Sequence, residues 1–199
     1  SNRCDRPTRS RGVPVVMRHD RRARDLDLLD AIDQLPRISI HETVWRVIRS
    51  GSDPLLCRTS SGRWGPRDLE ILYTAKDPDG AVAEMYFHLS RQPVFPSKVR
   101  FTLNEIEVRT RQTLKFSSLG ELETLGVDQD GYSGLLYERT QKIGDAAAFL
   151  GVDGIIAPSA RWDGLNLVIF CDNLNPEDLA LVSSREIDWT GWRKNPAQE

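Results

Sequence analysis

A carboxylate and an imidazole stand one helical turn apart near the middle of this 199-residue chain. Glu84 and His88 are four residues apart in a segment of helical pattern, so their side chains share one face of the helix. Arg91 follows about a turn later. A carboxylate and an imidazole that share a helix face can transfer protons. Pairs with this spacing are also common on solvated helices, so the spacing alone does not define a site.

Four more polar side chains interrupt apolar or glycine-flanked segments. Arg46 lies in a strand pattern that is apolar on both sides, and Arg63 stands between a glycine and a tryptophan in a loop. Tyr73 lies within a short apolar strand, and Ser159 follows a proline directly after another. Loops that follow strands often carry functional side chains. Each residue also has an ordinary structural explanation, so the evidence lies in their combination and order.

The elements that must position these side chains form a mixed α+β domain from about residue 37 to 190. The segment 116–136 is rich in glycine, which indicates loops and short turns. Hydrophobic periodicity and turn residues predict helices at 25–35, 77–91 and 140–150, and strands at 43–48, 71–75, 98–109, 154–157, 166–171 and 179–187.

The charge of the chain is divided unevenly along its length. Lysine and arginine number 27 and aspartate and glutamate 29, for a net charge of -2. Residues 1–24 contain eight arginines and two acids, a charge of +6, which leaves -8 for the rest of the chain. A body of that sign is a poor general binder of nucleic acid, because such binding depends mainly on neutralising phosphates.

The cysteines and the apolar segments give evidence about the cellular compartment of the protein. Cys4, Cys57 and Cys171 are widely spaced, and an odd count without a disulfide framework indicates a reducing environment. The beginning of the sequence is polar and arginine-rich rather than apolar like a signal peptide. No apolar run approaches the roughly 20 residues of a membrane span. These features predict a cytoplasmic protein, and three histidines without clustered cysteines argue against a zinc site.

The polar residues described above, taken in order, resemble the RES-domain family, which is named for its Arg, Glu and Ser. The resemblance extends over roughly residues 43–176, and the segment from Arg63 to Glu84 is its most specific part. The motifs that carry it are Trp45-Arg46-Val47, Gly62-Arg63-Trp64, Ile71-Leu72-Tyr73, Ala83-Glu84-Met85 and Pro158-Ser159. The usual family loop is Gly-Gly-Arg-Trp-Asn, whereas this chain has Ser61-Gly62-Arg63-Trp64-Gly65. The missing asparagine could change how the loop closes on a substrate.

This resemblance implies a bacterial toxin of α+β fold, with mixed, largely antiparallel sheets and flanking helices, similar to ADP-ribosyltransferases. It implies cleavage of the nicotinamide–ribose bond of NAD+, consumed as a substrate without a metal. The ADP-ribose would pass to phosphate, water or a protein such as a phosphoribosyl pyrophosphate synthetase. A cognate Xre-type antitoxin would cover the pocket and would carry the DNA binding. No Gly-x-Gly-x-x-Gly motif follows a strand, which argues against a Rossmann-type dinucleotide site.

The resemblance also implies a catalytic role for Arg63, Glu84 and Ser159, and the spacing of His88 from Glu84 adds His88 to this catalytic set. Breaking the bond creates a cation at the anomeric carbon of the ribose, which a carboxylate such as Glu84 stabilises. Ser159 can hydrogen-bond the ribose or the amide of the substrate. His88 can orient Glu84 or act on the proton of the acceptor near neutral pH.

Four residues are expected to bind NAD+ under the same resemblance. Arg46 and Arg63 are candidates for the diphosphate, because the guanidinium fork fits phosphate oxygens. Trp64 and Tyr73 are candidates for an aromatic wall against the flat nicotinamide ring. The domain division that follows is an Arg-rich arm with an amphipathic helix over residues 1–36 and a catalytic domain over residues 37–199.

Two other classes of protein are compatible with the sequence. The first is a ribonuclease-type toxin, since Arg63, Glu84 and His88 could also serve phosphodiester cleavage. The acidic body of the chain and the single suitable histidine argue against it. The second is a binding module without catalysis, in which the basic residues and amphipathic helix of residues 1–35 dock onto an acidic partner or DNA.

Overall fold

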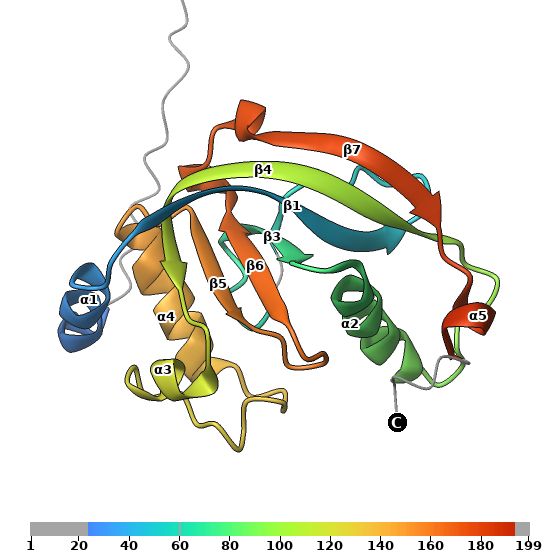
Figure 1. Cartoon of the computed structure of the whole chain (residues 1–199). Coiled ribbons are helices and arrows are strands. Elements are labelled where there is room, and N and C mark those ends of the chain that lie inside the picture. The colour runs from blue at the N-terminus through green and yellow to red at the C-terminus, as the bar shows by residue number, and fades with distance from the viewer. Residues whose placement is uncertain (1–23, 60, 194–199) are drawn as a thin grey trace, which may run out of the picture.

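One seven-stranded sheet organises the computed structural model, which describes residues 24–59 and 61–193. Its strands lie mainly antiparallel, and helices flank them (Figure 1). In chain order the helices and strands are α1 (Leu26–Asp33), β1 (Ile38–Arg49), β2 (Arg58–Thr59), β3 (Glu70–Ala75), α2 (Pro78–Ser90), β4 (Phe101–Lys115), α3 (Leu119–Glu123), α4 (Glu138–Phe149), β5 (Gly154–Pro158), β6 (Leu165–Phe170), the 3-10 helices η1 (Cys171–Asn173) and η2 (Pro176–Asp178), β7 (Leu179–Glu186) and α5 (Trp189–Arg193).

The strand pairings close into a ring. β1 and β4 pair antiparallel along most of their length and form the long arch across the top of Figure 1. β3, β6 and β5 follow one another as antiparallel neighbours beneath the arch. The ring closes where β5 joins the end of β4 in parallel and where Trp45 of β1 pairs with Ala75 of β3. This closure brings the segment around residue 84 close to the segment around residue 160.

Helix α2 packs under the arch, against β1, β3 and β4 (Figure 1). Asp77 caps its start by accepting a hydrogen bond from the Gly80 N–H at 2.7 Å, and Pro78 occupies the first turn. Val82 and Leu89 are buried in a core cluster with side chains of β1 and β4. Because one face of the helix is fixed in the core, its polar residues are held in a defined direction.

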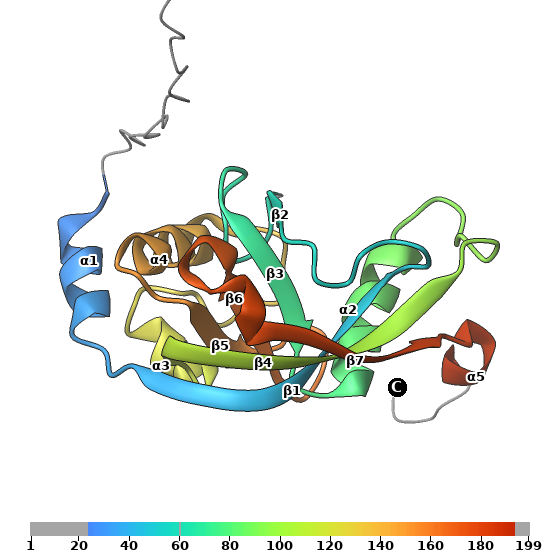
Figure 2. The ribbon, with the colours of Figure 1, turned by 90° about the horizontal axis from the view of Figure 1, so that it is seen from above.

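Helices α1 and α4 pack side by side at the other end of the sheet (Figure 2). Asp25 caps α1 by accepting the Leu28 N–H at 3.1 Å. Leu28 and Ile32 of α1 are buried in the same core cluster as Ile143 of α4. This part of the predicted segment 1–36 is therefore packed onto the domain, whereas residues 1–23 lie outside the described residues. The proposed domain boundary at residue 36 stays a prediction.

The predicted fold class is confirmed in its coarse form, since the sheet is mixed, largely antiparallel and flanked by helices. The predicted helices at 25–35, 77–91 and 140–150 correspond to α1, α2 and α4. The strand predicted to end at residue 109 continues to Lys115, where its end pairs with β5. The sequence did not predict the two-residue strand β2 or the short helices α3 and α5, whose patterns are too brief to have a period.

The structure contains a disulfide that the sequence did not predict. The number and spacing of the cysteines indicated no disulfide framework, but the structure joins Cys57 and Cys171 in a disulfide with an S–S distance of 2.03 Å. The two residues are 114 positions apart, and the strand ring places the loop before β2 beside the end of β6. Sequence spacing could not reveal this neighbourhood. Among the described residues, no helix is both long enough and apolar enough to cross a membrane.

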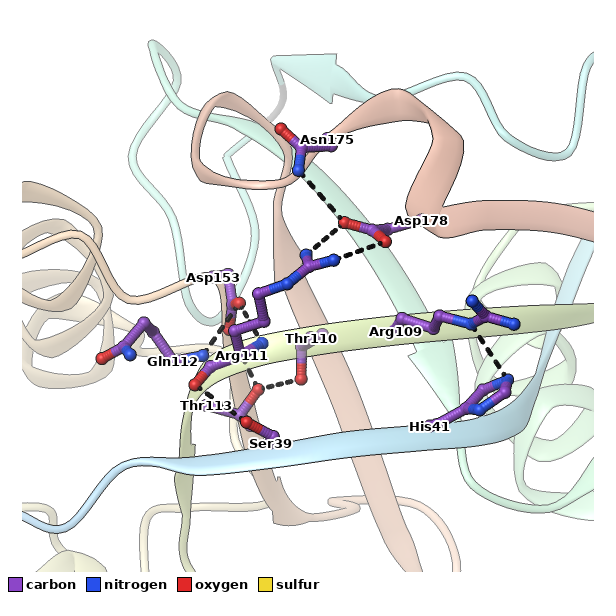
Figure 3. Close-up of polar contacts among 10 residues, drawn as sticks. All are labelled: Ser39, His41, Arg109, Thr110, Arg111, Gln112, Thr113, Asp153, Asn175 and Asp178. Atoms are coloured by element: carbon purple, nitrogen blue, oxygen red, sulfur yellow. Dashed lines mark hydrogen bonds and ion pairs between the residues drawn. The ribbon is translucent and has the colours of Figure 1, made fainter.

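A polar network fixes the point where β4 meets β5 (Figure 3). Asp153 is 4% exposed and accepts hydrogen bonds from the backbone N–H groups of Arg111 at 2.6 Å and Gln112 at 2.9 Å. Its other carboxylate oxygen accepts from the Thr113 hydroxyl at 3.0 Å. The Arg111 guanidinium in turn forms a two-pronged ion pair with Asp178. Asp153 therefore satisfies three donors at the closure of the ring.

We expect Asp153→Ala to lower the free energy of unfolding by about 2–4 kcal/mol, since it removes a buried carboxylate that accepts hydrogen bonds from three donors. The measurement is urea unfolding followed by circular dichroism, with Asp163→Ala as control because Asp163 is exposed. If Asp153→Ala and Asp163→Ala unfolded at the same urea concentration, the structural role of Asp153 would be contradicted.

Candidate active site

The carboxylate of Glu84 is held by two side chains from the β5–β6 hairpin. Ser159 Oγ donates a hydrogen bond to Glu84 Oε1 at 2.8 Å, and Asn166 Nδ2 donates to the same oxygen at 3.0 Å. No hydrogen bond from another described residue reaches Oε2. Two donors on one oxygen fix the orientation of the carboxylate and leave the other oxygen for a ligand.

The hairpin loop reaches Glu84 because its backbone closes tightly beside the start of α2. The Ser159 N–H donates to the Gly164 carbonyl at 2.8 Å, and the Arg161 N–H donates to Ser159 Oγ at 3.1 Å. A Cβ on Gly164 would stand 2.7 Å from Asp77 Oδ2, the carboxylate that caps α2. Glycine therefore permits the loop and the helix start to approach closely, and this contact sets Ser159 opposite Glu84.

Arg63 lies at the tip of a tight loop that reaches across to the segment before α4. Its guanidinium donates to the carbonyls of Tyr132 and of Gly134, the latter at 3.3 Å. It also lies over the rings of Tyr132 and Tyr137, 4.6 and 4.7 Å from their centroids. The glycine before it is required, since a Cβ on Gly62 would be 2.4 Å from the hydroxyl oxygen of Tyr73.

Tyr132 connects the Arg63 loop to the Glu84 cluster. Its hydroxyl donates to the Pro158 carbonyl at 2.7 Å, immediately before Ser159. Burial raises the pKa of Tyr132 to about 12, so its hydroxyl keeps its proton at physiological pH. A continuous set of contacts therefore runs from Arg63 through Tyr132 to the serine that holds Glu84.

His88 lies one turn beyond Glu84 but forms no hydrogen bond with it among the described residues. The pKa of His88 lies below its ordinary value of 6.5, chiefly because burial disfavours the charged imidazole. The charge of Glu84 opposes this shift, and the charges of Arg161, Arg91 and Arg63 add to it. His88 is therefore neutral at pH 7, which suits a group that accepts a proton.

The lowered pKa of His88 can be measured by NMR titration of its imidazole resonances. The resonance that disappears in His88→Gln should titrate below pH 6.5. Glu84→Gln should lower this pKa further, since it removes a favourable negative charge, and Arg161→Gln should raise it. Opposite signs for the two variants would show that the charges around His88 are wrongly assigned.

Phe87 supports two arginines next to this histidine. The Arg161 guanidinium carbon lies 3.4 Å from the centroid of the Phe87 ring, and that of Arg91 lies 5.4 Å from it. Arg161 also donates to the carbonyl of Ser133 at 2.5 Å. The positive charges here come from two elements, the end of α2 and the β5–β6 loop.

Three predicted residues have contacts elsewhere. Arg46 donates to the carbonyls of Pro54 and Leu56 at 2.8 and 3.0 Å, and desolvation lowers its pKa to about 10. Trp64 is 2% exposed and belongs to the core. Tyr73 is half-buried, its hydroxyl accepts the Trp64 N–H at 3.2 Å, and burial raises its pKa to about 12.

The structure thus gathers Arg63, Glu84, His88 and Ser159 into one region, whereas Arg46 anchors a different loop. Several residues of this region were not predicted from the sequence. Arg91 was noted only for its spacing. Phe87 and Asn166 lie in a predicted helix and a predicted strand but were not singled out, and three others lie in segments without a clear pattern: Tyr132, Tyr137 and Arg161. The one available signal for Arg161 was its place two residues after the Pro158-Ser159 motif.

A cavity between α1 and α4 lies apart from the region around Glu84. It has a volume of about 570 Å³, and its walls include Arg24, Asp145 and Gln141. None of the residues predicted to be catalytic or to bind NAD+ lines it. No group of three or more His, Cys, Asp or Glu side chains able to hold a metal occurs within residues 24–59 and 61–193.

An oriented carboxylate among arginines, a neutral imidazole and aromatic rings defines the kind of protein. It is the arrangement expected of a RES domain, and the RES domain family matches this chain over residues 14–190. The chain belongs to that family.

Known proteins similar to this chain include mycobacterial ones. The proteins named NAD(+) phosphorylase MbcT in Mycobacterium tuberculosis and Mycobacterium bovis are each 26% identical to it over 172 residues, covering 83% of this chain and 92% of theirs. A chain in the crystal structure of the M. tuberculosis MbcT–MbcA toxin–antitoxin complex shares the fold, with a TM-score of 0.76. That match is 24% identical and covers 85% of this chain and 97% of the other.

Proposed function

We propose that this chain cleaves the nicotinamide–ribose bond of NAD+ and transfers ADP-ribose to an acceptor. The observation that carries the proposal is the Glu84 carboxylate, which Ser159 and Asn166 hold by one oxygen so that the other can face a substrate. Membership of the RES domain family and similarity to proteins named NAD(+) phosphorylase support the choice of substrate. Inorganic phosphate is accordingly the first acceptor to test.

The bond between the ribose and the nicotinamide breaks with its electron pair leaving on the nicotinamide nitrogen. Positive charge then develops at the anomeric carbon, and Glu84 Oε2 stabilises it at short range. The transfer is completed when an oxygen of the acceptor forms a bond to that carbon. Phosphate as a dianion needs no base for this step, whereas water must lose a proton, which neutral His88 accepts.

The other residues predicted to bind NAD+ have different roles in this proposal. Tyr73 provides an aromatic contact for the nicotinamide ring, and Trp64 supports it from within the core. Arg63 orders the segment before α4 and contributes positive charge toward the diphosphate. The guanidinium of Arg46 donates to the carbonyls of Pro54 and Leu56 instead, so we do not assign it to the diphosphate. The ADP-ribosyltransferase likeness belongs to the same proposal, as does a protein acceptor such as a phosphoribosyl pyrophosphate synthetase.

The proposed activity is tested by measuring nicotinamide release from NAD+ by the purified chain with and without phosphate. Release that requires phosphate indicates a phosphorylase, and release without it indicates a glycohydrolase. A labelled protein band that appears only with cell extract indicates transfer to a protein. No release under any of these conditions would refute the proposal.

We further propose a protein partner that covers the site, namely an antitoxin of the Xre type. The shared fold with a chain from a toxin–antitoxin complex supports it. The charge of -8 outside residues 1–24 favours DNA binding by the partner rather than by this chain. The complex should release nicotinamide more slowly than the free chain, and equal rates would contradict this partner's role.

A further inference from the structure

We infer that Arg91 and Arg161, mounted on the ring of Phe87, form an anion subsite beside Glu84 that takes a phosphate group. This inference rests on the proposed function and extends it to residues outside the RES motifs described above. The subsite joins the last turn of α2 to the β5–β6 loop, so neither element forms it alone.

The helix face that meets this loop carries groups suited to a ligand rather than to the core. Phe87, His88 and Arg91 follow Glu84 by three, four and seven residues, so they lie along one stripe of α2 and its C-cap. The guanidinium of Arg161 packs at 3.4 Å from the Phe87 ring centroid, and that of Arg91 lies at 5.4 Å from the same centroid. Two cations share one aromatic ring.

The charges in this region do not balance without a ligand. Within the part of the chain that the structure describes, neither Arg91 nor Arg161 forms an ion pair with a carboxylate. Arg63 acts electrostatically on Arg161, as does Glu84. With His88 neutral, three arginines face one glutamate, a net charge of +2. The diphosphate of a dinucleotide carries two negative charges, so it would offset this excess.

Arg161 is oriented before any ligand arrives. One terminal nitrogen, Nη1, donates to the Ser133 carbonyl at 2.5 Å and to the Ala160 carbonyl at 3.3 Å. The other guanidinium N–H groups donate to no described residue, so they are available to phosphate oxygens. The backbone N–H of Arg161 also donates to Ser159 Oγ, which holds Glu84. An anion bound by Arg161 is therefore placed at a fixed position relative to the carboxylate.

Two sources supply the same chemistry: the diphosphate of NAD+ and the inorganic phosphate acceptor. Kinetics separate them in Arg161→Gln and Arg91→Gln, with Arg185→Gln on the exposed strand β7 as control. If the diphosphate binds here, the KM for NAD+ rises roughly 10-fold or more and the KM for phosphate is unchanged. If the acceptor binds here, the KM for phosphate rises instead. Arg161→Lys should restore part of the loss, because charge is kept and the fork is lost.

Calorimetric titration of the full chain with inorganic phosphate, pyrophosphate and ADP-ribose keeps the test independent of turnover. Binding of at least one of these probes should weaken roughly 10-fold in Arg161→Gln and stay unchanged in Arg185→Gln. If the wild-type chain binds a probe but does not cleave NAD+, the subsite stands and the proposed function fails. Equal affinities in the wild type and in Arg161→Gln, or no binding of any probe, would overturn the subsite.

Discussion

Glu84→Gln should release nicotinamide from NAD+ about 100-fold more slowly than the wild-type chain, or slower still. The amide keeps the shape of the side chain but removes the negative charge, which is the part that stabilises the developing cation. The measurement is the initial rate of nicotinamide release at saturating NAD+. Glu177→Gln is the matched control, because Glu177 is an exposed glutamate on η2, and its rate should stay unchanged.

The two donors to Glu84 give this prediction a second test. Ser159→Ala and Asn166→Ala each remove one hydrogen bond to Oε1, and each should slow the reaction less than Glu84→Gln does. If both residues act by orienting the carboxylate, Ser159→Ala and Asn166→Ala should not slow the reaction further in the Glu84→Gln background. This is the result that a double-mutant cycle gives for coupled residues. Fully additive losses would show that Ser159 and Asn166 contact the substrate on their own account.

Gly144→Ala should lower the free energy of unfolding by about 2–4 kcal/mol, through a backbone clash. Gly144 lies in the buried face of α4, and a Cβ there would stand 1.6 Å from the carbonyl oxygen of Trp64. Alanine favours a helix interior by up to about 1 kcal/mol over glycine, which is too little to offset the clash. The measurement is chemical unfolding, and nicotinamide release should fall as well because Trp64 adjoins Arg63.

The control for this change is another glycine within a helix. A Cβ on Gly120 of α3 would meet only Ser118 Oγ at 3.7 Å, an ordinary contact. Gly120→Ala should therefore leave stability unchanged or raise it slightly. A stable Gly144→Ala variant would mean that α4 and the Trp64 loop can separate without cost.

The order of the elements followed from local patterns, whereas their closure into a ring did not. The helix beginning at Asp77-Pro78 was predictable because a capping residue and a proline mark its first turn. The end of β4 was not, since residues 113–115 pair with β5 through a contact between distant segments. The disulfide between Cys57 and Cys171 was missed for the same reason.

The residues of the candidate site also differ in whether the sequence could predict them. Glu84, His88 and Arg63 stand out as polar residues in motifs, and the structure places them in one region. Asn166 was counted as one residue of a strand, and nothing in its immediate sequence indicates a bond to a helix 82 positions earlier. Trp64 was predicted from its residue type as a ligand wall, and its 2% exposure follows from packing that sequence alone does not reveal.

The two donors to Glu84 come much later in the chain than Glu84 itself, so the carboxylate cannot be oriented until both have been synthesised. Ser159 lies 75 residues after Glu84 and Asn166 lies 82 after it. A growing chain on the ribosome that has not yet exposed β5 and β6 has the carboxylate but neither of its two donors. Synthesis of the 82 residues from Glu84 to Asn166 is therefore a delay, during which a partner can bind the chain before its carboxylate is oriented for chemistry.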